Sequence, residues 1–313
     1  QENVIGSLWY IKYKIFNEKD YVTVATTRPE TMLGDSAIAI HPKNKKLNHL
    51  IGKYAVVPIC ERKIPIIADE YADPEKGSGA VKITPAHDFN DFVVGKKHNL
   101  EMINIFNKDA KINFEDQTSL HGLDRFEARK RIVLELERLK LIKKIEKNEM
   151  VIPKCDRSNS IIEPMLTEQW FCDAKKLAKP IKQFILKKKI KFFPPNWVNS
   201  FNYWINNIEP WCISRQIWWG HRIPAWYTED GDIIVAENLD EAKKIAKKKF
   251  KIKEPLLSQD TDVLDTWFSS ALWPFSTLGW PKTTNDFKEF YPTSVLITGF
   301  DIIFFWVARM VMM

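Results

Sequence analysis

Apolar and polar residues alternate, or form short apolar runs, through most of the first half of the chain. This pattern predicts short β-strands, which we place at residues 4–16, 21–27, 36–40, 54–59, 63–68 and 80–84. The polar residues 17–20 separate the first two strands, so we expect these strands to form a hairpin. Short strands punctuated by Pro, Gly and Asp favour a compact, β-rich α+β domain.

Two segments of the first half have the spacing of amphipathic helices. The first is expected over residues 88–97 and the second over residues 125–147, where apolar residues recur on one face. Asp124 and Glu127 resemble a capping box at the start of the second helix. We expect this helix to close a first domain that comprises residues 1–150.

The second half of the chain has a different composition, with many tryptophans and lysines. We interpret residues 151–195 as a connector that includes a basic helix, and residues 196–313 as a second domain. The apolar run 295–298, followed by Gly299 and Asp301, has the pattern of a buried parallel strand that ends before a helix. Open α/β sheets bind nucleotides at such strand ends, so the run predicts part of a doubly wound, Rossmann-type sheet.

The overall composition is that of a globular protein with a basic surface. Among 313 residues there are 47 Lys and Arg against 40 Asp and Glu, a net charge of +7, which favours polyanionic partners. The four cysteines form no C-x-x-C pair, so we expect a reducing cytoplasm and neither a zinc ribbon nor a disulfide framework. The most apolar segment, residues 295–313, contains Asp301 and Arg309, so no membrane span is expected.

A polar motif follows the second predicted strand. Thr26, Thr27 and Thr31 contribute three hydroxyls, and Arg28 and Pro29 lie between them. Proline restricts its own φ and biases the preceding residue toward extended backbone, so the strand should end in a defined turn. Arginine offers a rigid fork of donors, which together with hydroxyls suits a sugar or a phosphate. The alternative is an ordinary turn in which Thr31 caps the next helix.

A second polar motif covers the sixth predicted strand and the start of the helix after it. It contains Lys82, Thr84, His87, Asp88 and Asp91. The two aspartates are three residues apart, so on a helix they share one face near its N-terminus; alternatively, both simply cap that helix. No Ser–His or Cys–His arrangement indicates a covalent mechanism, and His87 has no close partner for a metal ion, so no metal site is predicted.

Together, the two motifs resemble those of the editing domain in the valyl-tRNA synthetases, a family of class I aminoacyl-tRNA synthetases. The resemblance continues through the tryptophan-rich residues 218–222 and 275–281 to the last residue. It implies a barrel-like editing domain at residues 1–150, inserted into a Rossmann-type catalytic core that residues 196–313 represent only in part. The sequence is therefore expected to be an internal piece of a longer protein.

The resemblance also implies a reaction. Editing domains of this family hydrolyse threonine that has been wrongly esterified to tRNA(Val). Such a step is needed because an apolar pocket built for valine rejects the extra hydroxyl by only about a hundredfold. A second site that hydrogen-bonds the hydroxyl can reject valine, since valine would leave buried polar groups unpaired. Water would be the nucleophile, positioning would supply most of the catalysis, and no cofactor is expected for editing.

By the same resemblance, the motif residues receive roles. Lys82, Thr84 and Asp88 would read the threonine hydroxyl. Asp91 would hold the substrate ammonium, and Asp88 and Asp91 are the predicted catalytic residues. The rest of the predicted substrate-binding set is Thr26, Thr27, Arg28, Thr31 and His87. Of these, Arg28 and Thr31 would position the terminal adenosine and the ester.

For the second domain, the resemblance implies part of a site that activates valine. Trp267 would line the valine pocket with Trp219 or its neighbour Trp218, and Gly299 and Asp301 would meet the ATP ribose; core packing is the alternative for each tryptophan. The family's His-x-Gly-His and Lys-Met-Ser-Lys-Ser motifs are expected outside this sequence, so the chain alone should not activate valine. The complete enzyme would be a cytoplasmic monomer that uses ATP, Mg²⁺, valine and tRNA(Val), with threonine as the editing ligand.

Two alternatives remain open. The chain could belong to a leucyl or isoleucyl relative, which would deacylate a different mischarged tRNA. It could also be a basic RNA-binding piece without activity, which predicts tRNA affinity that falls steeply with salt and no hydrolysis.

Overall fold

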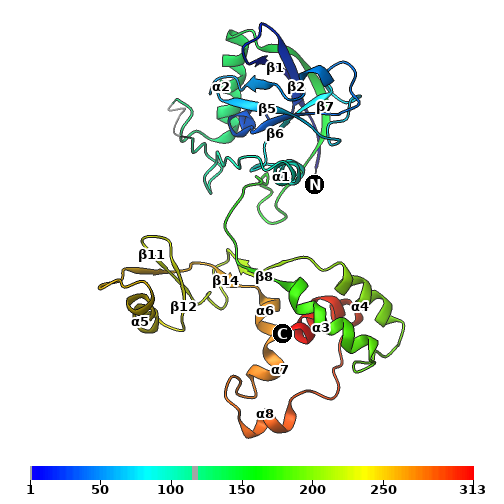
Figure 1. The fold of residues 1–313 in the computed structure, drawn as a ribbon, viewed down its shortest axis with the longest axis vertical. Coiled ribbons are helices and arrows are strands. Elements are labelled where there is room, and N and C mark those ends of the chain that lie inside the picture. The colour runs from blue at the N-terminus through cyan, green and yellow to red at the C-terminus, as the bar shows by residue number, and fades with distance from the viewer. Residues whose placement is uncertain (1, 115–118) are drawn as a thin grey trace. The chain divides into compact units, whose positions relative to one another are not determined.

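A computed structural model describes residues 2–114 and 119–313. The chain divides into two compact units, Gln1–Thr167 and Glu168–Met313 (Figure 1), which we call unit 1 and unit 2. Each unit has a hydrophobic core of its own. The assignment of residues 1–150, 151–195 and 196–313 to an editing domain, a connector and a catalytic core stays a prediction.

Unit 1 is built around a seven-stranded sheet. Its strands are β1 (Glu2–Ile15), β2 (Tyr21–Thr26), β3 (Ala37–Ile40), β4 (Tyr54–Val56), β5 (Lys63–Ala68), β6 (Ala80–Ile83) and β7 (Ile142–Ile152). The hydrogen-bonded order is β2-β1-β4-β5-β3-β6, with β7 paired to β1, and β3 runs parallel to β5. Strands β2 and β6, at opposite ends of this order, lie next to each other, so the sheet is nearly closed. The expected β-rich, barrel-like fold of the first domain is confirmed.

The predicted hairpin is also confirmed. Strands β1 and β2 are antiparallel in a register that runs from Trp9 opposite Thr26 to Lys14 opposite Tyr21. Alternation along β1 turns one set of side chains inward, so that Ile11 and Ile15 are fully buried. Burial of an aliphatic side chain of this size stabilises the fold by about 1.5–3 kcal/mol. The alternating pattern therefore determines which face of the hairpin packs on the core.

The second predicted helix is shorter than expected. Asp124 caps α2 (Arg125–Arg138) by accepting a hydrogen bond from the Phe126 amide, so the part of the predicted capping box that Asp124 supplies is confirmed. The helix ends before Lys140, whose φ of +58° is incompatible with continued helix, and β7 then pairs with β1. The prediction of helix to residue 147 was wrong because pairing with a distant strand, which local spacing does not reveal, satisfies the backbone groups of β7.

Two short elements border the cavity described below. Helix α1 (Phe89–Lys97) begins where the sequence predicts, directly after β6 and a turn. A 3₁₀ helix, η1 (Pro29–Gly34), follows β2, and all six of its residues are buried. A second 3₁₀ turn, η2 (Asn48–Leu50), lies between β3 and β4.

Unit 2 combines helices with short antiparallel strands. The helices are α3 (Ala174–Leu186), α4 (Trp197–Asn206), α5 (Leu239–Lys249), α6 (Thr266–Ala271), α7 (Trp273–Ser276), α8 (Asn285–Phe290) and α9 (Ala308–Met312), with η3 (Phe300–Ile302) and η4 (Ile303–Val307) before α9. The strand pairs are β8 (Phe171–Cys172) with β9 (Trp211–Cys212), β10 (Ser214–Arg215) with β14 (Val263–Leu264), and β11 (Ala225–Thr228) with both β12 (Ile233–Val235) and β13 (Leu257–Gln259). Helices α3, α4 and α9 contribute to one core.

The apolar segment near the end of the chain differs from the prediction. Residues 295–298 form no strand, and Val295 and Ile297 are 76% and 89% exposed. The described part of unit 2 contains only antiparallel strand pairs, so the predicted buried parallel strand is wrong and no doubly wound sheet is formed within it. An apolar run becomes a parallel strand only beside neighbouring strands, and none pairs with this run. Within residues 2–114 and 119–313, no helix has the length and apolar character needed to span a bilayer.

Candidate functional site

A pocket of about 240 Å³ in unit 1 lies where β2, η1, β6 and α1 meet. Both predicted motifs reach it, and every residue predicted for the editing site lines it: Thr26, Thr27, Arg28, Thr31, Lys82, Thr84, His87, Asp88 and Asp91. Leu8, Ala25, Tyr71 and Val81 complete the lining. Residues more than 50 positions apart in sequence therefore share one cavity, although their individual roles stay predictions.

Local backbone geometry brings the two motifs together. Strand β6 pairs with β3, and the Ser36 amide donates to the Ile83 carbonyl at 2.8 Å, which fixes the end of β6 beside the end of η1. A Cβ added at Gly34 would lie 3.2 Å from Cγ2 of Thr84, so the absence of a side chain at Gly34 permits this close approach. Thr31 lies inside η1 and donates to the Arg28 carbonyl, so the alternative in which Thr31 caps a helix is wrong.

The ammonium of Lys82 is the centre of a buried polar network. It donates to Oγ1 of Thr31 at 2.9 Å, to Oδ1 of Asp35 at 2.9 Å, and to Oγ1 of Thr84. The side chain of Lys82 is 8% exposed and that of Asp35 is fully buried. A buried ammonium is stable only when its charge and its donors are satisfied, and here all three donors have acceptors. Direct donation from Lys82 to a ligand would require the loss of one of these bonds.

Asp35 is a member of this network that the sequence analysis did not include. Its Oδ1 accepts from Lys82 and from the Thr84 hydroxyl at 2.6 Å, and its Oδ2 accepts from the Tyr13 hydroxyl at 2.7 Å. Burial, followed by the nearby Asp35 carboxylate, holds the pKa of Tyr13 well above its ordinary value. A lysine inside an apolar strand needs a buried carboxylate, and this requirement was the available signal for Asp35.

Asp91 presents a buried carboxylate to the pocket. One oxygen, Oδ2, accepts from the Thr84 amide at 2.8 Å, and the residue is 7% exposed. Burial raises the pKa of Asp91 to about 6, and Asp88 and Asp35 add to that effect while Lys82 opposes it. Asp88 differs, because it is exposed and caps α1 by accepting from the amides of Asn90 and Asp91. The helix-cap alternative therefore applies to Asp88 and not to Asp91.

Arg28 is held on the rim of the pocket by several acceptors. Its guanidinium pairs with Glu30 at 3.3 Å, donates to the His87 carbonyl at 3.1 Å, and pairs with Glu163. Arg125 holds the second oxygen of Glu163 at 2.9 Å. The residues just after β7 therefore fold back onto the site, a contribution that sequence spacing could not indicate.

Glu30 is buried beneath Arg28. Arg129 of α2 binds it through two bonds of 2.7 and 2.8 Å. Burial alone would raise the pKa of Glu30, but the bonds from Arg129 outweigh it and the pKa is lowered. This pair, in which Glu30 is buried and Arg129 is 24% exposed, connects α2 to η1 and so supports the wall of the pocket.

The ring of His87 is fully engaged with backbone. Its Nε2 accepts from the Ile105 amide at 3.0 Å, and this leaves Nδ1 as the donor to the Pro164 carbonyl at 3.1 Å. Burial lowers the pKa of His87 to about 4, so the ring is neutral at physiological pH. Neither ring nitrogen is free for a ligand, and a role for His87 in substrate binding would be structural.

The residues predicted for valine activation are placed in unit 2 but not in its main pocket. Trp218 and Trp219 are fully or almost fully exposed, and Gly299 and Asp301 are also exposed. Trp267 instead packs against Phe305, with ring centroids 6.2 Å apart. The core-packing alternative fits Trp267, and the roles of the other residues stay predictions.

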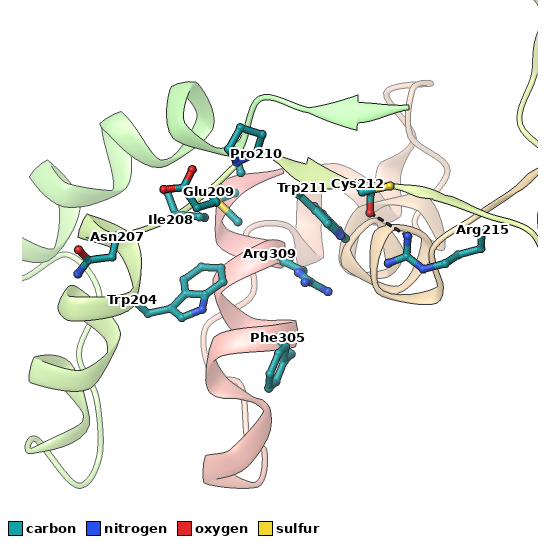
Figure 2. Close-up of a pocket in the computed structure, with 12 residues that line it drawn as sticks. Trp204, Asn207, Ile208, Glu209, Pro210, Trp211, Cys212, Arg215, Phe305 and Arg309 are labelled. Carbon is teal, nitrogen blue, oxygen red and sulfur yellow. Dashed lines mark hydrogen bonds between the residues drawn. The ribbon is translucent and has the colours of Figure 1, made fainter. Parts of the chain in front are cut away.

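That main pocket of unit 2 has about 450 Å³ (Figure 2). The guanidinium of Arg309 lies 4.0 Å from the centre of the Trp211 ring, and Arg215 donates to the Cys212 carbonyl beside it. Arg309 Nη1 is buried without a hydrogen-bond partner among the described residues, and burial lowers the pKa of Arg309. No group of three or more His, Cys, Asp and Glu residues within the described ranges is arranged to hold a metal ion.

Several valine–tRNA ligases are similar to this chain along its whole length. The identity is 59% to that of Pelagibacter ubique and covers 100% of this chain and 36% of the relative. It is 54% to that of Legionella pneumophila (strain Paris), over 98% and 33%, and 52% to that of Caulobacter vibrioides, over 100% and 37%. The chain thus spans about a third of the length of these curated relatives, and the resemblance to valyl-tRNA synthetases is confirmed.

A solved structure is also similar, although distantly. It is the ternary complex of the Agrobacterium radiobacter K84 agnB2 LeuRS with tRNA and LeuAMS, at 15% identity and a TM-score of 0.37, covering 91% of this chain and 32% of that one. Residues 16–313 match the family described as tRNA synthetases class I (I, L, M and V). Because that match includes almost the whole sequence, the chain belongs to the class I tRNA synthetases.

Proposed function

We propose that the pocket of unit 1 hydrolyses threonine from mischarged tRNA(Val). The observation that carries the proposal is that the two predicted motifs line one small cavity and contribute hydroxyls, an ammonium and carboxylates to its wall. At about 240 Å³ this cavity is smaller than the range of about 300–1,000 Å³ usual for larger ligands. It suits an aminoacyl group, with the tRNA end outside.

The polar wall supports selection of threonine over valine. The two amino acids have nearly the same shape, so an apolar pocket separates them by only about a hundredfold. In the pocket of unit 1, the hydroxyl oxygens of Thr31 and Thr84 lie beside Lys82, where a threonine hydroxyl would find partners. A valine methyl in the same place would leave buried polar atoms without partners, at a cost of about 1–3 kcal/mol for each.

Asp91 supplies the charge that an aminoacyl ester needs. The ammonium of the substrate would stabilise the ionised form of this carboxylate, whose pKa burial raises to about 6 in the free protein although Lys82 opposes the shift. Asp88, exposed beside it, remains the second predicted catalytic residue. Arg28, on the rim, would meet the terminal adenosine or the ester.

Water is the proposed nucleophile. None of the side chains that line the pocket is serine or cysteine, and the ring of His87 is committed to backbone partners. Ester hydrolysis would then depend on the position of the ester relative to water and on exclusion of misplaced substrates. No side chain of the pocket is assigned as the proton acceptor.

We extend the proposal to the longer protein that the relatives represent. Their names, valine–tRNA ligases, support the joining of valine to tRNA(Val). We propose in addition that the longer protein uses ATP and Mg²⁺ and is a cytoplasmic monomer. In that protein unit 2 would belong to the catalytic core, with Trp219, Gly299 and Asp301 near valine and ATP. Within the 313 residues only the editing reaction is proposed.

The test is hydrolysis of four aminoacyl-tRNAs by the purified chain. We expect Thr-tRNA(Val) to be hydrolysed and Val-tRNA(Val) to be spared. Preferential hydrolysis of a mischarged tRNA(Leu) or tRNA(Ile) would assign the chain to a leucyl or isoleucyl relative. Salt-sensitive tRNA binding without any hydrolysis would favour the RNA-binding alternative and would refute the proposed activity.

A further inference from the structure

Three side chains in the wall of the unit 1 pocket have all their hydrogen-bond donors committed to protein atoms. The ammonium of Lys82 has three donors, and they go to Thr31, Asp35 and Thr84. The hydroxyl of Thr84 donates its proton to Oδ1 of Asp35 at 2.6 Å. The hydroxyl of Thr31 donates its proton to the Arg28 carbonyl at 3.0 Å.

What these side chains can offer a ligand is therefore limited to acceptors. A hydroxyl oxygen has one proton and two lone pairs, and Lys82 takes one lone pair of each threonine. Each hydroxyl oxygen keeps one lone pair, and both residues line the cavity. A ligand that meets this wall finds two acceptors and no donor from Lys82, Thr31 or Thr84.

Asp35 determines this arrangement although it does not line the cavity. It is fully buried, and its Oδ1 accepts from both Lys82 and Thr84. Without that oxygen, the Thr84 proton would be free to turn toward the cavity and one Lys82 donor would lose its acceptor. The other oxygen, Oδ2, accepts from the Tyr13 hydroxyl and makes no bond to Thr84 or Lys82.

We propose that Asp35 is a positioning residue that orients the Thr84 hydroxyl and the Lys82 ammonium so that the pocket presents hydroxyl acceptors to its ligand. The pocket then selects a side chain that donates a hydrogen bond. A threonine hydroxyl can donate its one proton to either acceptor, whereas a valine methyl leaves both acceptors unpaired. The identity of the ligand, threonine, rests on the proposed function. The conclusion that the wall offers acceptors rests on the hydrogen bonds alone.

The test compares the affinities of the purified chain for threoninamide and valinamide, two small probes that carry the ammonium but no ester. The variants are Asp35→Ala, Asp35→Asn and Tyr13→Phe, each measured by calorimetry alongside hydrolysis of Thr-tRNA(Val). We expect Asp35→Ala to reduce the preference for threoninamide about tenfold or more, the effect of one lost hydrogen bond to a charged group. Asp35→Asn should restore only part of the preference, because its amide oxygen can accept from the same two donors but leaves the buried Lys82 ammonium without its counter-charge.

Tyr13→Phe is the matched control. It removes a buried hydrogen bond to Asp35 but leaves both bonds that orient Thr84 and Lys82, so the preference should stay at the wild-type value. The proposal is overturned if folded Asp35→Ala keeps the wild-type preference, if Tyr13→Phe lowers it equally, or if the wild-type chain has no preference. A wild-type chain that prefers threoninamide but hydrolyses no Thr-tRNA would refute the proposed function and leave the role of Asp35 standing.

A measurement on the wild-type chain covers the case in which Asp35→Ala does not fold. Hydroxyl protons held in buried hydrogen bonds exchange slowly with water and can be observed by NMR. We expect slow exchange for the hydroxyl protons of both Thr84 and Thr31. A Thr84 hydroxyl proton that exchanges at the rate of an exposed threonine would overturn the proposal.

Discussion

Lys82 and Asp35 form an ion pair that is almost completely removed from water. Nζ of Lys82 lies 2.9 Å from Oδ1 of Asp35, and the two side chains are 8% and 0% exposed. Lys53 and Glu18 form a pair at the same distance of 2.9 Å, but their side chains are 38% and 36% exposed. The two pairs have the same shortest N–O distance and differ in burial, so comparing them shows how much removal from water adds to the cost of losing one charge.

We predict that Lys82→Met destabilises the chain by about 3–5 kcal/mol, because it leaves the buried Asp35 carboxylate without its counter-charge. Lys53→Met, the exposed counterpart, should change stability by about 1 kcal/mol or less. Denaturant unfolding of both variants measures the difference. The double variant Lys82→Met/Asp35→Asn should recover part of the loss, and equal costs for Lys82→Met and Lys53→Met would contradict the buried pair.

Asp91 should be required for hydrolysis but not for folding. We predict that Asp91→Asn, whose amide oxygen can still accept from the Thr84 amide, reduces Thr-tRNA hydrolysis about a hundredfold or more, since a buried charge pair with the substrate is worth about 2–5 kcal/mol. Asp91→Ala should do the same. The melting temperature checks the fold, and Asp20→Asn on the hairpin turn serves as the control. Unchanged turnover in Asp91→Asn would remove Asp91 from the mechanism.

The same carboxylate predicts a pH dependence. With a pKa of about 6 in the free protein, Asp91 is increasingly protonated below pH 6 and loses its charge for the substrate ammonium. We expect kcat/KM for Thr-tRNA to rise between pH 5 and about pH 7, as Asp91 ionises. Above about pH 7, Asp91 should cause no further increase. N-acetylthreonyl-tRNA, which lacks the ammonium, and the Asp91→Asn variant should both lack this step. Identical profiles for all three would show that Asp91 does not bind the ammonium.

His87 should make folding stability depend on pH between about 4 and 6.5. Its pKa falls from 6.5 to about 4 on folding, so between these values the unfolded chain binds a proton that the folded chain does not. Stability should therefore fall as the pH drops from 6.5 to 4, by at most about 3 kcal/mol from this residue. Denaturant unfolding at several pH values measures the effect.

The control for His87 is another histidine. His87→Gln should remove this pH dependence, whereas substitution of the exposed His49 by Gln should leave it unchanged. Asp91 acts with the opposite sign, because its raised pKa makes the folded chain hold its proton more strongly and stability falls as the pH rises from 3.8 to about 6. Comparing the unfolding free energy of each variant with that of the wild type at each pH separates the contribution of His87 from that of Asp91. Equal pH profiles for the wild type and His87→Gln would refute the assignment.

Local pattern was sufficient for much of unit 1. Alternation along β1 and β2 predicted the hairpin, and the positions of Asp88 and Asp124 predicted the starts of α1 and α2. These features depend on neighbours within a few residues, which the sequence displays directly. The convergence of Thr31 and Lys82 came from the family resemblance, since no local rule brings η1 beside β6.

The errors share a physical origin in long-range contacts. Strand β7 exists because β1 offers it backbone partners more than 130 residues earlier in the chain. Residues 295–298 have the composition of a buried strand, but no strand within residues 2–114 and 119–313 pairs with them. Asp35 and Glu163 were missed because their roles depend on Lys82 and Arg28, each from a distant segment. Composition and spacing show which secondary structures a segment can form, and the segment that pairs with it determines which one it forms.

The pairing of β1 with β7 affects how readily residues 2–152 could be inserted into another protein. Glu2 lies opposite Ile152, so the two ends of this stretch leave the sheet side by side. A host protein could accept the whole stretch between two adjacent residues of a surface loop without forcing that loop apart, and the entropic cost of a long excursion grows only slowly with its length. The same adjacency makes the stretch a candidate for transfer into another protein. Joining Glu2 to Ile152 through a short linker would also permit circular permutation.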